Sequence, residues 1–103
     1  MNLADTLNQR GTRYGEFKDH ADLCQRLKSQ MHRSRNWSKL DSDMTEALEM
    51  IQHKIARILN GDPSYHDSWH DIAGYATLVA DRLMPPKPSQ MDRVIAALED
   101  DNK

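Results

Sequence analysis

Apolar residues recur every three or four positions in four segments of the chain, which is the spacing that places them on one face of an α-helix. The pattern predicts helices over residues 16 to 32, 43 to 60, 65 to 83 and 90 to 99. No window alternates apolar and polar residues with the period of two that is typical of a strand. The sequence therefore predicts an all-α fold, a bundle of about four helices.

Turn-forming and capping residues stand between these segments, where helices are expected to stop. Asp43 with Glu46, and Ser64 with Asp67, have the spacing of capping boxes at the starts of the second and third helices. Glycine and proline favour helix ends because glycine accepts a left-handed conformation and proline cannot continue a helix. The predicted ends of these two helices are Asn60-Gly61-Asp62-Pro63 and Met84-Pro85-Pro86.

The second and third predicted helices have the strongest apolar patterns. Residues 72 to 80 carry no charge, so the third helix is apolar or small on nearly every face and is predicted to lie at the centre of the bundle. We expect the segment before residue 16 and the acidic tail after residue 99 to be flexible. The predicted core stripe of the second helix is Met44, Leu48, Ile51, Ile55, Ile58 and Leu59.

The length and the charge of the chain limit the classes of function. With 103 residues, the chain is long enough for one modest core, and residues 1–103 are predicted to form a single domain. The net charge is −2, but residues 1–39 carry eight Lys and Arg against four Asp and Glu. This basic third could face a phosphate-bearing ligand, whereas the acidic remainder argues against binding to a long nucleic acid.

The sequence also bears on the compartment. Cys24 is the one cysteine, so it cannot form an intrachain disulfide, and no Cys/His set has the linear spacing of a zinc motif. No run of about 20 apolar residues and no secretory signal pattern is present. We therefore expect a cytoplasmic protein without a membrane segment, in which Cys24 is a small core residue.

Carboxylates on the second and third predicted helices are candidates for a metal site. Residues three or four apart share a helical face, and two packed helices can aim such oxygens into a common space. Oxygen ligands suit Mg²⁺, which is often held by a few carboxylates together with substrate phosphates. The predicted ligands are Glu46, Glu49, Asp71 and Asp67, with Mg²⁺ as the cofactor and Mn²⁺ as a substitute.

The same acids have ordinary structural alternatives. Glu46 and Asp67 can act as capping acids, and Glu49 lies opposite the apolar stripe, as solvated residues do. Asp71 is predicted to sit against a second packing surface, where an unpaired carboxylate would be costly. Pairing with a cation would remove that cost, and the candidates are Lys54, Arg57 and Arg82.

Four other residues could meet a nucleotide. Lys54 and Arg57 follow the Glu pair and could bind phosphates, although the polar flank of an amphipathic helix needs no such role. His53 shares the helical face of the Glu pair. Tyr14 could present its ring to a base, although a hydrophobic staple is the commoner use of such a loop. His66 and His70 also share a face, but without a third ligand they do not predict a zinc site.

Two resemblances extend this interpretation. Glu46-x-x-Glu49, followed by Asp71 leading into Ile-Ala-Gly-Tyr-Ala-Thr-Leu, resembles the all-α nucleotide pyrophosphohydrolases, the MazG and dimeric dUTPase superfamily. Three longer stretches are similar to a family of small uncharacterised phage and prophage proteins. These stretches are Arg10 to Phe17, Glu46 to Asp62 and Asp67 to Ala76.

The superfamily resemblance implies a homodimeric, MazG-like helical bundle that hydrolyses nucleoside triphosphates to monophosphates and pyrophosphate with Mg²⁺. Glu46 and Glu49 would be ligands from one helix and Asp71 the ligand from the next. The chain departs from the superfamily pattern at Ser68, where a Glu is expected, and no catalytic residue is assigned. The alternative is an inactive bundle that binds a host or defence protein. A nucleic-acid-binding module is disfavoured by the net charge.

Overall fold

The structure is a computed structural model, and it describes residues 2–85 and 95–98. Within these residues there is no strand, and residues 95–98 are helical. The prediction of an all-α fold is therefore confirmed for the described part of the chain. In chain order, the elements are α1 (Leu3–Tyr14), α2 (Phe17–His32), the short 3₁₀-helix η1 (Trp37–Lys39), α3 (Ser42–Asn60) and α4 (His66–Leu83).

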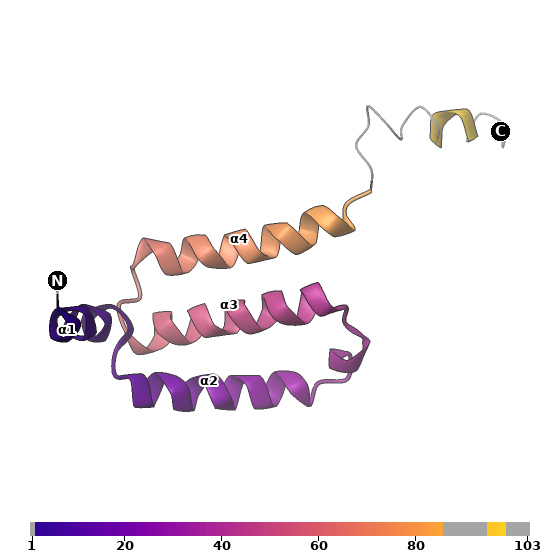
Figure 1. Cartoon of the computed structure of the whole chain (residues 1–103). Coiled ribbons are helices and arrows are strands. Elements are labelled where there is room, and N and C mark those ends of the chain that lie inside the picture. Colours follow the sequence, from indigo (N-terminus) through magenta and orange to yellow (C-terminus); the bar gives the residue numbers. More distant parts are fainter. Residues whose placement is uncertain (1, 86–94, 99–103) are drawn as a thin grey trace.

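Three of these helices form a single layer. Figure 1 shows α2, α3 and α4 side by side with α3 in the middle, and the chain reverses direction from each helix to the next. Helix α1 lies across one end of the layer, where it is seen end-on, and it packs against α2 and α3. The end of the layer where α1 lies is the place where three helices meet.

The prediction that residues 65–83 form the central helix is wrong. The central position belongs to α3, which packs against both α2 and α4. Among the described residues of α4, Ser68 is the buried one, whereas Leu78 is 69% exposed. An uncharged stretch therefore does not place a helix at the centre, because burial depends on how many neighbours the helix has.

The predicted apolar stripe of α3 is only partly buried. Ile58 is buried, but Leu48, Ile55 and Leu59 are exposed. The central helix of a layer touches its neighbours along two opposite lines, so one broad stripe cannot face a common core. Small or polar residues occupy part of these lines, and the buried positions of α3 are Ala47, Gln52, Ala56 and Ile58.

The N-terminal segment also differs from the prediction. Residues 3–14, expected to be flexible, form α1, and the side chain of Asn2 caps this helix by accepting a hydrogen bond from the backbone N–H of Asp5 at 2.9 Å. None of the residues of α1 is buried, and the helix carries few apolar residues, so apolar spacing did not predict it. Most of the helix predicted over 90–99, and the predicted flexible tail, lie outside the described residues.

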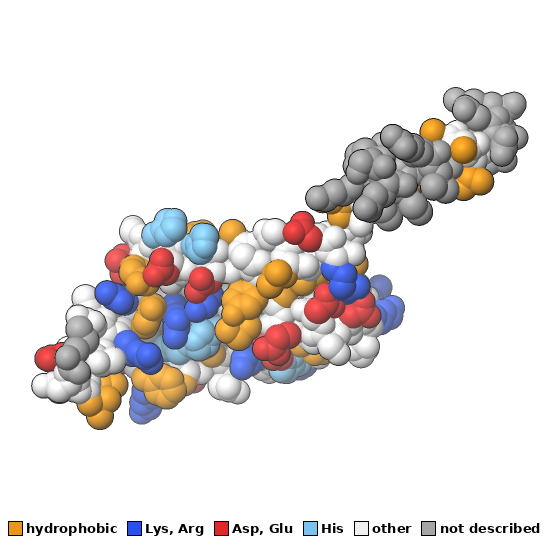
Figure 2. Space-filling view, turned by 45° about the horizontal axis from the view of Figure 1, so that its top comes forward, with side chains coloured by type: hydrophobic (Ala, Val, Ile, Leu, Met, Phe, Trp, Pro, Cys, Tyr) orange, Lys and Arg blue, Asp and Glu red, His pale blue; other side chains and the backbone are white. Residues whose placement is uncertain are grey.

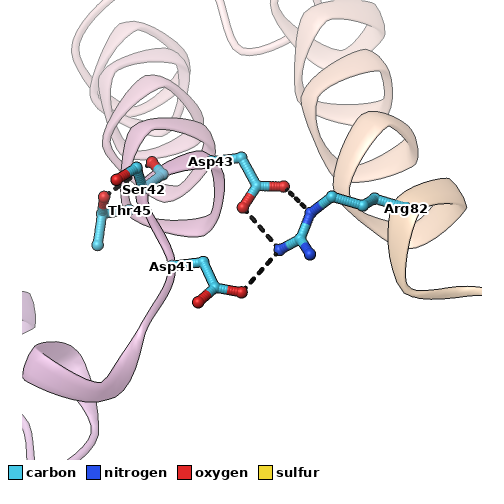
Figure 3. A network of polar contacts seen from close by, with 5 residues as sticks. All are labelled: Asp41, Ser42, Asp43, Thr45 and Arg82. Atoms are coloured by element: carbon cyan, nitrogen blue, oxygen red, sulfur yellow. Dashed lines mark hydrogen bonds and ion pairs between the residues drawn. The ribbon is translucent and has the colours of Figure 1, made fainter.

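Both predicted capping boxes are wrong. Helix α3 begins after Asp41, and Asp43 lies within its first turn. Figure 3 shows that Asp41 and Asp43 instead bind Arg82 of α4, which donates from Nη2 to Asp41 at 3.0 Å and to Asp43 at 2.7 Å. Helix α4 begins after Tyr65 without a side-chain cap. A carboxylate near a helix start binds a guanidinium readily when the fold brings one within reach.

The helices of the described residues are too short or too polar to cross a lipid bilayer.

Candidate functional site

The corner between α1 and α2 is tied to the end of α3 by hydrogen bonds. Gly15 joins the two helices with a positive φ of 77°. The side-chain amide of Asn60, the last residue of α3, donates to the carbonyl oxygens of Tyr14 at 3.0 Å and Glu16 at 3.1 Å. The backbone N–H of Asp62 donates to a carbonyl oxygen of α1 at 2.6 Å. The bonds to Tyr14 and to α1 satisfy carbonyl groups that the end of α1 would leave unpaired.

Two glycines let these segments approach each other closely. A Cβ atom on Gly15 would lie 2.1 Å from the carbonyl oxygen of Asn60, and one on Gly61 would lie 2.1 Å from the carbonyl oxygen of Arg13. Both distances are far shorter than van der Waals contact, so a side chain at either position would push α1 away from α3. The two glycines therefore fix where α1 lies.

A cavity of about 640 Å³ opens where α1, α2 and α3 meet, and we call it the corner pocket. Its volume is in the range of small-molecule sites, roughly 300 to 1,000 Å³. Helix α1, the Gly15 turn, the start of α2 and the second half of α3 all contribute to its wall. The lining side chains with polar or aromatic chemistry include Arg10, Tyr14, Glu16, Phe17, His20, His53 and Arg57.

Cations and aromatic rings line the corner pocket. The guanidinium carbon of Arg57 lies 4.1 Å from the centre of the Tyr14 ring, a cation–π contact that orders both side chains. Phe17 is 79% exposed at the rim. Within the residues that the structure describes, no carboxylate lies within ion-pair distance of Arg57 or Arg10. The positive charge of these arginines is thus available to a ligand.

Two histidines form the floor of the corner pocket. The rings of His20 and His53 meet edge to face with their centres 4.7 Å apart, and His20 is only 4% exposed. Burial lowers the pKa of both imidazoles, and the neighbouring Arg57 lowers them further. The pKa of His53 falls to about 4. Both rings are therefore neutral at neutral pH.

Cys24 joins the two histidines below the pocket. Its sulfur lies 3.4 Å from Nε2 of His20 and 3.9 Å from Nδ1 of His53. The prediction that Cys24 is buried is confirmed. The spacing of Cys and His along the sequence did not reveal this cluster, because its members come from both α2 and α3. The available signal was the spacing of His20 and Cys24, which are four residues apart and so share a helical face.

Asp71, a predicted magnesium ligand, pairs with a lysine. Its carboxylate lies 3.0 Å from Nζ of Lys54, and this ammonium lowers the pKa of Asp71. Lys54 was among the expected structural partners of Asp71, and it was also the residue expected to meet phosphates. Because Lys54 binds Asp71, it is not directed into the corner pocket.

The other predicted ligands point to different neighbours. Glu49 lies 2.8 Å from Nε2 of His32 on α2, and Asp67 accepts a hydrogen bond from the hydroxyl of Tyr65 at 3.1 Å. Glu46 is exposed. In the part of the chain that the structure describes, the one group of three potential metal ligands around a common point is His20, Cys24 and His53. The four carboxylates are therefore not brought together within one chain.

Comparison with protein families gives one result. Residues 4–83 match the model of a domain of unknown function, DUF6378. The chain belongs to the DUF6378 family. Neither the curated proteins nor the solved structures include a match to it. The family match gives no link to MazG proteins or to phages, so both relationships stay predictions that rest on the sequence resemblance.

The DUF6378 match begins in α1 and ends with α4, so it includes every residue that lines the corner pocket. Three of the four residues predicted to meet a nucleotide line this pocket together, namely Tyr14, His53 and Arg57. Sequence reasoning missed Arg10 and His20. Their positions depend on α1 and on the Gly15 corner, which the apolar pattern did not reveal.

Proposed function

We propose that this DUF6378 domain binds a nucleoside triphosphate, or a similar phosphate-bearing small molecule, in the corner pocket. The observation that carries the proposal is the position of Arg57, a half-buried guanidinium in the wall of a cavity, with no carboxylate at ion-pair distance in the described residues. A partly buried cation attracts an anion more strongly than one in bulk water because less solvent screens the interaction.

The chemistry of the guanidinium suits phosphate. Its planar array of N–H donors matches the oxygens of a phosphate group in pairs, and such charge-assisted hydrogen bonds are stronger than neutral ones. The ring of Tyr14 holds the guanidinium in place, which reduces the entropy lost on binding. Arg10 supplies a second cation at the rim.

The remaining wall suits a base and a sugar. The exposed ring of Phe17 offers an apolar face on which a planar base can stack. The neutral imidazole of His53 has one nitrogen that donates and one that accepts hydrogen bonds, as the hydroxyls of a sugar require. Arginine, aromatic and neutral polar groups in one cavity support a nucleotide rather than an inorganic ion alone.

Calorimetric titration with each nucleoside triphosphate tests this proposal. Arg57→Gln should weaken binding by roughly 10- to 150-fold, because a hydrogen bond to a charged group contributes about 1.5 to 3 kcal/mol. Arg26→Gln is the matched control, since Arg26 pairs with Asp22 on the surface of α2 and does not line the pocket. Equal affinities of the wild-type protein and Arg57→Gln, or no binding by the wild-type protein, would overturn the proposal.

Hydrolysis with Mg²⁺, the activity implied by the MazG resemblance, is a second proposal that depends on assembly. We propose it only for a homodimer in which a second copy brings Glu46 and Glu49 close to Asp71. The exposure of Glu46, which has no ion-pair partner in the described residues, supports this idea, because such a carboxylate is free to bind a cation. Mg²⁺ would neutralise the phosphates and help to activate water.

Release of pyrophosphate in the presence of Mg²⁺ tests the second proposal. Glu46→Gln should abolish release while nucleotide binding in the corner pocket is kept, and the exposed Asp81→Asn should change neither. Nucleotide binding without release would leave a binding protein. If neither binding nor release occurs, the alternative of an inactive bundle that binds a host or defence protein becomes the better hypothesis.

A further inference from the structure

The three side chains below the corner pocket form a second candidate site, which does not depend on nucleotide binding. We propose that His20, Cys24 and His53 bind a divalent transition-metal ion of the Zn²⁺ type. Two of the ligands stand one helical turn apart on α2, and the third comes from the facing side of α3. Both helices are anchored by packing, so the ligands are held on rigid elements.

The spacing of the ligand atoms is close to what such an ion requires. In a tetrahedral Zn²⁺ site with bonds of about 2.3 Å to sulfur and about 2.0 Å to nitrogen, the sulfur and each nitrogen lie about 3.5 Å apart. The sulfur of Cys24 lies 3.4 Å from a nitrogen of His20 and 3.9 Å from one of His53. Ligand atoms of all three residues lie within 4.8 Å of one another. Small rotations of the side chains would complete the geometry.

The kind of ligand selects the kind of metal. One thiolate and two imidazoles suit zinc and its chemical relatives, whereas Mg²⁺ prefers oxygen ligands. Burial already lowers the pKa of His20 and His53, so the metal does not have to displace a proton from either ring. Cys24 would lose its proton on binding, and the resulting thiolate would offset one of the two positive charges of the ion.

A second observation points to a ligand. His20 is almost fully buried, yet its Nδ1 has no hydrogen-bond partner among the described residues, and its Nε2 faces only a thiol. A buried polar group without a good partner costs free energy, so an imidazole in such a position needs a compensating interaction. A bond from Nε2 to a metal ion is much stronger than a hydrogen bond to sulfur, so it would compensate for the burial of the ring at Nε2, while Nδ1 would carry the ring proton.

Three protein ligands leave one position of a tetrahedral ion open. Structural zinc sites are closed by four protein ligands, whereas sites with three ligands accept water or a substrate atom. His20 and His53 line the corner pocket as well as the cluster. The cluster thus adjoins the pocket, and a Zn²⁺ ion whose open position faces the pocket would act as a Lewis acid toward a molecule bound there.

Cobalt(II) titration of the tag-free, chelator-treated full chain tests the site. One equivalent should produce a sulfur-to-cobalt charge-transfer band and the intense visible bands of a four-coordinate ion, and Zn²⁺ should displace both. Cys24→Ser should remove the charge-transfer band. His53→Gln should weaken binding by more than the roughly 10- to 100-fold that outer-shell changes cost. The double variant His66→Gln/His70→Gln is the control, because these exposed histidines stack on α4 away from the cluster.

The wild-type spectrum alone can overturn the proposal, so the test does not depend on how well the variants fold. Failure to produce a charge-transfer band with excess Co²⁺ would exclude a thiolate site. Cobalt binding that survives Cys24→Ser but disappears in the His66→Gln/His70→Gln variant would place the metal on α4. This result would also contradict the proposal. Nucleotide titrations run with a chelator present remain independent of either result.

Discussion

The ammonium group of Lys54 lies 3.0 Å from the carboxylate of Asp71 and joins the second half of α3 to α4. The side chain of Lys54 is only 12% exposed, so its charge is largely removed from water and depends on this carboxylate. The pair explains why an acid stands at the packing surface of α4. It also makes Asp71 a structural residue within a single chain.

Asp71→Asn should therefore lower the melting temperature, because it leaves a largely buried ammonium without its counter-charge. If Asp71 only pairs with Lys54, the decrease should be the same with and without Mg²⁺, whereas a metal site shared between two copies would make it larger with Mg²⁺. Thermal melts at matched ionic strength measure this, with the exposed Asp81→Asn on the same helix as the control. If Mg²⁺ stabilises the wild-type protein and this stabilisation disappears in Asp71→Asn, then Asp71 is a metal ligand after all.

Two isoleucines of α3 should respond differently to truncation. Ile58 is 9% exposed, and Ile58→Ala should lower the free energy of unfolding by about 2 to 5 kcal/mol through lost burial and a cavity. Ile55 is 38% exposed, so Ile55→Ala should cost clearly less in a monomer. Urea denaturation measures both. Equal losses would mean that another surface covers Ile55.

The single layer of α2, α3 and α4 predicts self-association. A domain normally buries its apolar residues between two packed layers, whereas this layer leaves large side chains of α3 and α4 exposed, as the hydrophobic surface in Figure 2 illustrates. A homodimer that covers such a face would restore the second layer. Sedimentation equilibrium at micromolar concentration should give twice the mass of the chain, and a monomer would contradict the prediction.

The ion pair of Asp43 with Arg82 should make stability depend on pH. The hydrogen bonds from Arg82 lower the pKa of Asp43 below its ordinary value of 3.8 in the folded state. The contribution of the pair is therefore fully present above that value and is lost as pH falls through the lowered pKa. Asp43→Asn and Arg82→Gln should both reduce the acid dependence of the melting temperature. An unchanged pH profile in both variants would exclude the effect.

Much of the secondary structure follows from local signals. Helices predicted over 16–32, 43–60 and 65–83 are found at Phe17–His32, Ser42–Asn60 and His66–Leu83. Their apolar spacing and the Asn60-Gly61 stop act within a few residues, so they can be read from the sequence. The position of α3 at the centre could not be predicted from the sequence, because it depends on which helices pack against each other.

The candidate site was predictable only in part. Tyr14, His53 and Arg57 have side chains suited to a nucleotide, and they line one pocket. Convergence of the carboxylates was predicted from helical spacing alone, but the packing of α3 against its neighbours sends Glu49 toward α2 and Asp71 toward Lys54. The cluster of His20, Cys24 and His53 was missed for the same reason, since distances between helices are set by the tertiary fold.

Nuclear magnetic resonance of the glycine amides tests nucleotide binding in the corner pocket most directly. The chain has four glycines. Gly11 and Gly15 line the corner pocket, whereas Gly74 lies on α4 beside Asp71, so the amide signals distinguish the two candidate sites. In ¹⁵N-glycine-labelled protein, a saturating nucleoside triphosphate should shift the signals of Gly11 and Gly15 and leave that of Gly74 unchanged. A shift of Gly74 without shifts of Gly11 and Gly15, or no shift at all, would contradict nucleotide binding in the corner pocket.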